Sequence, residues 1–285
     1  MKDLHKPLSK DDYEEPSCLL IDEADGRPCS VQPVPQQRII EKMDEYMSRR
    51  DYAGAERHLL YWLEEARMGN DERGELMVRN ELIGHYRKVG DQDKAFAQAD
   101  EAMRLIRRLD YDGTISSGTT YTNMATMYHV FGEHERALQL FEKARRIYEE
   151  SPMTSSALLG GLYNNMALVS VSLGRFEEAH RLYDKAMEVM GKVPNGQLEQ
   201  AITCLNRADA IEEELGEEGE VRIFALLDQA LDMLDSPSIP HDGYYAFVCE
   251  KCYPSFEFYG YFMDAERLKD IAESIYRANR EEIDS

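Results

Sequence analysis

The chain has 285 residues, of which 55 are acidic and 33 are basic, and its formal net charge is −22. This charge argues against nucleic acid as the main partner, because binding to phosphates requires a basic surface. It suits a soluble elongated helical protein, or one that attracts a basic partner by electrostatic steering. No uninterrupted apolar run approaches the length of about 18 residues that a membrane span requires, so we expect no membrane contact.

Residues 1–35 differ in composition from the remainder of the chain. They contain five prolines and the acidic run Asp11–Glu15, which is typical of a mobile tail. They lack the apolar run of a secretory signal. The segment Cys18–Ile21 is apolar and is followed by acidic residues. We expect it either to pack as a short strand against the first helices or to dock in the protein's own groove.

A helical pattern begins at Gln36, and a second helix begins at Asp51 and Tyr52. Arg50 precedes this second helix, at a place where the later units have a glycine. Terminal repeats are commonly atypical because they cap a stack, so this departure is compatible with a repeat that begins here.

The stretch Gly118–Val193 contains two copies of one pattern, offset by 42 residues. Such self-similarity indicates a repeat architecture. Several residues of the first copy fall on the same or a similar residue of the second, namely Tyr121 on Tyr163, Asn123 on Asn165, Met124 on Met166, Ala125 on Ala167, Gly132 on Gly174, Ala137 on Ala179, Phe141 on Tyr183, and Ala144 on Ala186.

Each copy predicts two helices joined at a glycine, which tolerates the left-handed conformation that closes a helix. The second helix of each copy places small alanines and an aromatic on one face, which favours close packing of neighbouring helices. One helix pair cannot bury its own apolar face, so the pairs must stack. The four glycines Gly90, Gly132, Gly174 and Gly216 are each 42 residues apart.

These residues resemble the tetratricopeptide repeat, and the 42-residue unit with the run from Tyr163 to Ala167 resembles the kinesin light chain type. The resemblance implies an all-α, right-handed superhelical solenoid of about six stacked helix-turn-helix pairs. We expect a tail over residues 1–35 and a solenoid over residues 36–285. The expected units are 36–72, 76–117, 118–159, 160–201, 202–240 and 241–285.

The last two units depart from the pattern. Asp209 and Glu212 stand where the better copies have alanine and an aromatic residue or serine. The sixth unit is rich in aromatic residues, which either seal the end of the core or form an exposed adhesive face. Pro254 lies in its first helix and should break the hydrogen-bond ladder locally.

No pattern in the sequence predicts catalysis. Cys249 and Cys252 form a C-x-x-C pair, but a zinc site needs four ligands, and a redox motif belongs beside a βαβ unit. We expect two small apolar residues on a buried helix face. Phosphate-binding loops and nucleophile elbows are missing. We therefore predict no catalytic residue, no metal, no cofactor and no enzyme, and the five cysteines suit a reducing, cytoplasmic setting.

The first helices of stacked pairs line a concave groove. Asparagine is a modest helix former, so its recurrence nine and ten residues before the turn glycines suggests a use. In the resembled family, an asparagine nine before the glycine pairs with the backbone of a bound peptide, which an amide can do as donor and acceptor. The alternative is that these amides bond to neighbouring helices or to water. The predicted peptide-binding residues are Asn80, Glu81, Arg87, Asn123, Thr126, His129, Asn164, Asn165, Asn206 and Arg207.

The function predicted from these features is a protein–protein interaction scaffold that binds a peptide segment of a partner in the concave groove. The alternative is a peptide-responsive regulatory sensor whose superhelix changes when a ligand binds. The segment Cys18–Ile21 is a candidate internal competitor, because a short tether gives an effective concentration in about the mM range.

Overall fold

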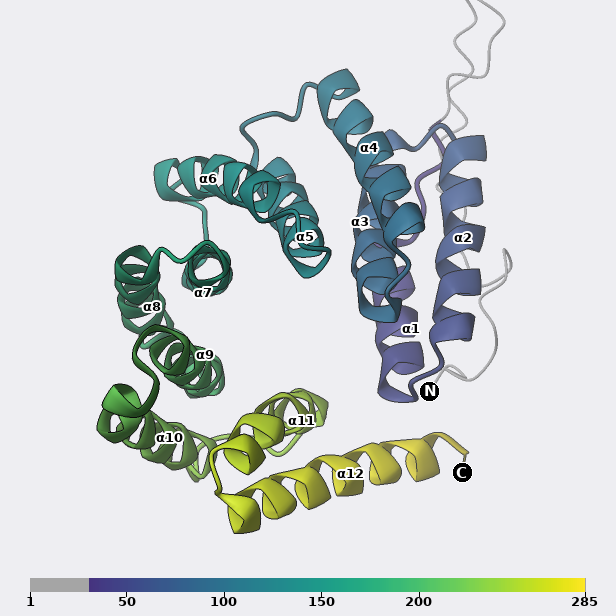
Figure 1. The fold of residues 1–285 in the computed structure, drawn as a ribbon. Coiled ribbons are helices and arrows are strands. Elements are labelled where there is room, and N and C mark those ends of the chain that lie inside the picture. Colours follow the sequence, from purple (N-terminus) through teal and green to yellow (C-terminus); the bar gives the residue numbers. More distant parts are fainter. Residues whose placement is uncertain (1–30, 285) are drawn as a thin grey trace, which may run out of the picture. The chain divides into compact units, whose positions relative to one another are not determined.

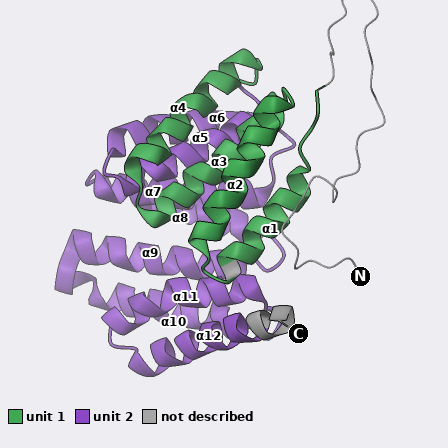
Figure 2. Ribbon diagram, turned by 90° about the vertical axis from the view of Figure 1, so that its right-hand side faces the viewer, with its two compact units in different colours: residues 1–112, 282–285 green, residues 113–281 purple. Residues whose placement is uncertain are grey.

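The computed structural model describes residues 31–284, which are helical apart from short connections (Figure 1). The chain divides into two compact units, which are coloured separately in Figure 2. The first unit runs to residue 112 and includes residues 282–285, and the second comprises residues 113–281. Within the described residues, no helix is both long enough and apolar enough to cross a membrane.

The first unit is built from two helix pairs. Its helices are α1 (Gln36–Ser48), α2 (Tyr52–Met68), α3 (Glu72–Val89) and α4 (Gln92–Arg108). Three aspartates begin α2, α3 and α4, and each accepts a hydrogen bond from the backbone N–H three residues later. Such caps satisfy N–H groups that have no partner inside the helix. Arg50 has a φ of 57°, so it takes the left-handed conformation that glycine adopts in the later turns.

The second unit contains the remaining helix pairs. Its helices are α5 (Ile115–Val130), α6 (His134–Glu150), α7 (Ser156–Ser172), α8 (Phe176–Met190), α9 (Gln197–Leu215), α10 (Glu220–Leu234), α11 (Gly243–Phe258) and α12 (Phe262–Asp284), with a short 3-10 turn, η2 (Gly216–Gly219), before α10. Within this unit, α5, α7, α9 and α11 form an inner row and α6, α8 and α10 an outer row (Figure 1). Together with the first unit, this confirms the predicted all-α architecture of paired helices.

The predicted small residues form the contacts between helices. Ala137, Ala144, Ala179 and Ala186 are all fully buried on α6 and α8. Gly132 closes α5 with a φ of 83°, in the left-handed region that glycine adopts at little cost. Alanine and glycine at these points let the helix axes approach closely, which buries the aromatic side chains between them.

The aromatic residues of the last pair are divided between the core and the surface. Tyr245 and Phe256 are buried in the core formed by α9 to α12. Tyr244 and Phe258, in contrast, are exposed on α11. The helix α11 continues through Pro254, so the proline removes one donor from the ladder without ending the helix.

Candidate functional site

Two inner helices of the second unit, α5 and α7, contain no aspartate, glutamate, lysine or arginine. Their N-caps, Thr114 and Ser155, are also neutral. This is unusual in a chain with 31% charged residues. Charged side chains at these positions would lose solvation where the two helices are largely buried. The side that stays accessible is therefore neutral and polar.

We call this accessible side, with its continuation on α9, the inner face. It consists of the half-buried side chains of Thr122, Asn123, Thr126, His129, Asn165, Leu168, Asn206 and Arg207. The remaining faces of α5 and α7 are mostly buried against their neighbours, so the stripe is narrow. The part of the stripe on α5 and α7 is neutral, which suits recognition of a main chain more than recognition of charge.

Asn123 and Asn165 are the two predicted residues that remain available for a ligand. Both are half-buried, and neither amide makes a hydrogen bond within residues 31–284. They occupy equivalent positions in successive helices, nine residues before Gly132 and Gly174. Each amide can donate and accept at once, as an extended peptide backbone requires.

Asn164 and Asn206 follow the alternative expectation instead. The amide nitrogen of Asn206 donates to the side-chain oxygen of Asn164 over 3.1 Å. Asn164 is only 6% exposed, so this bond satisfies a buried acceptor between α7 and α9. We therefore assign these two asparagines to the stability of the fold.

Arg207 and His129 also have partners inside the protein. The guanidinium of Arg207 forms an ion pair of 2.7 Å with Asp184 on α8. The Nδ1 atoms of His129 and His134 lie 3.2 Å apart, so one ring donates to the other. Burial, and then the charge of His134, lowers the pKa of His129, which favours its neutral ring.

Thr126 has an internal partner as well. Its hydroxyl donates to the carbonyl of Thr122 one turn earlier, over 2.9 Å. The oxygen of Thr126 keeps acceptor capacity, because a hydroxyl has two lone pairs. Thr126 is thus an accessory position beside Asn123.

The predicted residues of the first unit all lie on α3. Asn80, Glu81 and Arg87 are half-buried. Burial raises the pKa of Glu81, and the charge of Asp44 on α1 raises it further. Burial lowers the pKa of Arg87, whose side chain forms no ion pair in the described part of the chain. These three residues belong to the first unit and form a cluster that is separate from the inner face.

The C-x-x-C pair lies in the core. Cys249 and Cys252 are free thiols that are 0% and 1% exposed. Burial raises the pKa of Cys249 to about 11 and that of Cys252 to about 12. A thiol that stays protonated is neither a good nucleophile nor a metal ligand. Among the described residues, no three histidine, cysteine or acidic side chains form a group that could hold a metal.

The sequence model of the tetratricopeptide repeat family matches residues 75–150 and residues 116–192, which include α5 and α7. Residues 75–192 are therefore tetratricopeptide repeats. Repeats of this kind stack to form extended surfaces for partners. The tetratricopeptide repeat fold therefore supports a general role as a scaffold for protein–protein interaction.

Three solved structures resemble this chain at low sequence identity. BtubC (BKLC) from P. vanneervenii is 20% identical, with 86% of this chain and 92% of that chain covered and a TM-score of 0.49. Kinesin light chain TPR-like repeats from Podosopora anserina are 16% identical, with coverage of 70% and 94% and a TM-score of 0.48. A tetratricopeptide repeat protein from Parabacteroides merdae is 16% identical, with coverage of 86% and 98% and a TM-score of 0.41. No curated protein is significantly similar in sequence.

The residues predicted for the groove divide into two groups. Asn164, Asn206 and Arg207 are used inside the fold. Asn123 and Asn165 are available to a ligand. The absence of charge from α5 and α7 was not predicted, although a count of charged residues in each helix reveals it.

Proposed function

We propose that the inner face binds an extended peptide segment of a protein partner. The observation that carries this proposal is the pair Asn123 and Asn165, whose amides have no partner in the described structure. They stand on neighbouring helices that carry no charge. Main-chain groups of a peptide would pair with both amides, and the neutral surroundings would favour an uncharged stretch of that peptide.

The expected contribution follows from hydrogen-bond energies. A typical hydrogen bond contributes a net ~0.5–1.5 kcal/mol. Removal of both asparagines should therefore cost about 1–3 kcal/mol of binding free energy, which corresponds to a loss of affinity of roughly 5-fold to 150-fold. The fold should tolerate the change, because neither amide satisfies an internal partner.

The test starts from random peptides displayed on phage and selected on the full chain. We expect enriched sequences to be related to one another, and their Kd to rise by about tenfold or more in Asn123→Ala/Asn165→Ala. The matched control is Gln139→Ala, a neutral polar residue exposed on α6 of the outer row, which should leave Kd unchanged. Equal binding to the double variant and the control would refute the inner face as the site.

Scattering measurements with the same peptides address the sensor alternative. A scaffold should keep its radius of gyration when the peptide binds, whereas a sensor should change it. The scaffold is the function that we propose, because Asn123 and Asn165 lie on the helical core of the second unit, where α5 to α8 pack closely. The free cysteines of the described residues suit a reducing compartment, and we propose that the protein acts in the cytoplasm.

The N-terminal segment Cys18–Ile21 lies outside the described residues, and its docking in a groove belongs to this proposal. Arg87 and Lys88 on α3 would meet the acids that follow the segment. A bound segment would lower the apparent affinity for an external peptide by the fraction of free sites. Deletion of residues 1–35 should then tighten binding of the selected peptides, and an unchanged Kd would exclude the segment as a competitor.

A further inference from the structure

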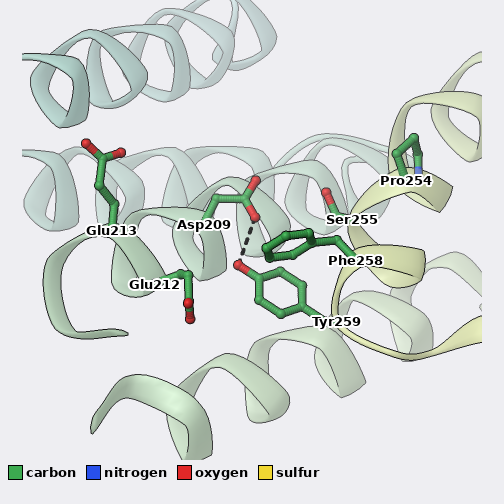
Figure 3. A pocket seen from close by; sticks show the side chains of 7 residues that line it. All are labelled: Asp209, Glu212, Glu213, Pro254, Ser255, Phe258 and Tyr259. Carbon is green, nitrogen blue, oxygen red and sulfur yellow. Dashed lines mark hydrogen bonds between the residues drawn. The ribbon is translucent and has the colours of Figure 1, made fainter. Parts of the chain in front are cut away.

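A pocket lies between α9 and the end of α11, inside the second unit (Figure 3). Its volume is about 420 Å³. The carboxylate of Asp209 on α9 points toward the aromatic rings at the end of α11, and the lining residues are Asp209, Glu212, Glu213, Pro254, Ser255, Phe258 and Tyr259. None of these residues belongs to the inner face.

The pocket exists because α9 departs from the repeat pattern at two core positions. Seven residues before the turn glycine, α5 and α7 bury Ala125 and Ala167, whereas α9 has Asp209. Four residues before it, α5 buries Tyr128, whereas α9 has Glu212. A carboxylate cannot replace a core aromatic without losing its hydration. The acids stay exposed, and the volume that a ring would fill is left open.

The pocket carboxylates have no cationic partner within residues 31–284. Asp209 accepts a hydrogen bond of 3.0 Å from the hydroxyl of Tyr259, and Glu212 and Glu213 form no hydrogen bond or ion pair. Asp209 is exposed but loses part of its hydration beside the packed helices, which raises the pKa of its carboxyl, and the bond from Tyr259 opposes the rise in part. The basic residue nearest in sequence, Arg207, is held by an aspartate of α8. The negative charge of this site is therefore uncompensated.

The charge of the pocket acids also acts on a buried hydroxyl of α8. Tyr183 on α8 is fully buried, and its hydroxyl makes no hydrogen bond in the described structure. Burial raises the pKa of Tyr183, the charges of Asp209 and Glu213 raise it further, and the charge of Arg207 opposes the rise in part. The field of the pocket acids thus reaches into the core, where it disfavours any further negative charge. A cation in the pocket would relieve it.

The opposite wall is aromatic and accessible. Phe258 is 74% exposed, and its ring meets that of Tyr259 edge-on with 4.9 Å between centroids. Pro254 extends this apolar wall by one turn of α11. A guanidinium suits such a wall, because it is planar and weakly hydrated, stacks on aromatic rings and presents several donors to carboxylates. A metal ion is less suited, since the described carboxylates form no metal-binding group.

We propose that this pocket binds an arginine side chain of the partner peptide. The guanidinium would stack on Phe258 and donate to Asp209 and Glu212. The source of the arginine rests on the proposed function, since the peptide on the inner face would supply it. The pocket itself can be tested without that peptide.

The probe is acetyl-arginine methylamide, titrated into the full chain and followed by amide shifts in TROSY spectra. Shifts should concentrate at residues 209–213 and 254–259 and saturate. The neutral isostere, acetyl-citrulline methylamide, should bind about tenfold more weakly or not at all. Asp209→Asn/Glu212→Gln should weaken the arginine probe by about tenfold, and Phe258→Ala should do so several-fold. The matched control, Glu217→Gln/Glu218→Gln, removes two exposed charges outside the pocket and should leave Kd unchanged.

Three outcomes would overturn the proposal. The first is equal binding of citrulline and arginine probes, and the second is unchanged binding in Asp209→Asn/Glu212→Gln. The third is a lysine probe that binds as tightly as arginine, which would remove the role of the planar guanidinium. Failure of the two proposals is distinguishable, because Asn123→Ala/Asn165→Ala should raise the Kd for the peptide by about tenfold or more but leave binding of the arginine probe unaffected.

Discussion

Gly118 and Gly160 provide a matched pair that tests the packing of the second unit. They occupy equivalent positions on α5 and α7, 42 residues apart, and each faces a side chain of the following helix. A Cβ added at Gly118 would lie 2.6 Å from a ring carbon of Tyr148. A Cβ added at Gly160 would lie 2.7 Å from both the Cγ and the terminal methyl carbon of Met190, and 2.8 Å from its sulfur. The two substitutions to alanine thus differ in the stiffness of the neighbour.

The magnitude follows from that difference. Carbon atoms prefer separations of about 3.5–4.0 Å, so either neighbour must move by roughly 1 Å. Tyr148 is 1% exposed and its hydroxyl lies 3.0 Å from that of Thr119, which leaves the ring little room. Overpacking of this kind costs about 1–3 kcal/mol. Met190 can bend around the new methyl group because its side chain is flexible. The gain in helix propensity, about 1 kcal/mol, is common to both alanines and cancels.

We expect Gly118→Ala to be less stable than Gly160→Ala by about 1–3 kcal/mol, measured by urea unfolding with an unchanged m value. In a thermal melt, the difference corresponds to roughly 2–12 °C for a unit of this size. Gly118→Ala combined with Tyr148→Met should recover part of the loss, because it installs the flexible neighbour. Equal stability of the two single variants would show that the ring of Tyr148 on α6 does not pack tightly against Gly118 on α5.

Three further predictions concern buried polar groups. Asn206→Ala should lower the free energy of unfolding by about 1–3 kcal/mol, because it leaves the side-chain oxygen of Asn164 without a donor. As a control, Asn123→Ala or Asn165→Ala should lower it by less than about 0.5 kcal/mol. Burial lowers the pKa of His58 below its ordinary 6.5, so the unfolded chain binds more protons below pH 6.5 and stability falls there. That loss should shrink in His58→Gln, and an NMR titration that places the pKa of His58 above 6.5 would contradict it. Cys249 and Cys252 should react with a disulfide reagent only after unfolding; fast reaction in the native state would contradict their burial.

The repeat architecture could be predicted because its determinants are local. Gly132 and Gly174 end helices, and alanines such as Ala137 and Ala179 face other helices, so residue type and spacing suffice. Whether each asparagine is buried and hydrogen-bonded or accessible to a ligand could not be predicted in the same way. Asn164 and Asn165 are adjacent in sequence, yet one is buried and bonded to α9 and the other is half-exposed. That difference depends on a helix 42 residues away.

The same limitation explains why the pocket was not predicted. Asp209 and Glu212 were recognised from the sequence as departures from the repeat, and a departure in a late unit suggests a weakened copy. In three dimensions, each departure removes a buried group from the contact between α9 and α11 and places a carboxylate at its edge. Phe258 is exposed on the facing helix, and no aligned position of the repeat relates it to Asp209. Local rules are expected to fail at functional sites, where stability is given up for binding. In the fifth unit, the repeat pattern is lost at the two positions that line the pocket. The other core positions of this unit keep small or apolar residues, since Ala208, Ile211 and Ala230 are buried. Selective loss of this kind favours a binding site over general decay of the repeat, because decay would have affected the buried positions as well.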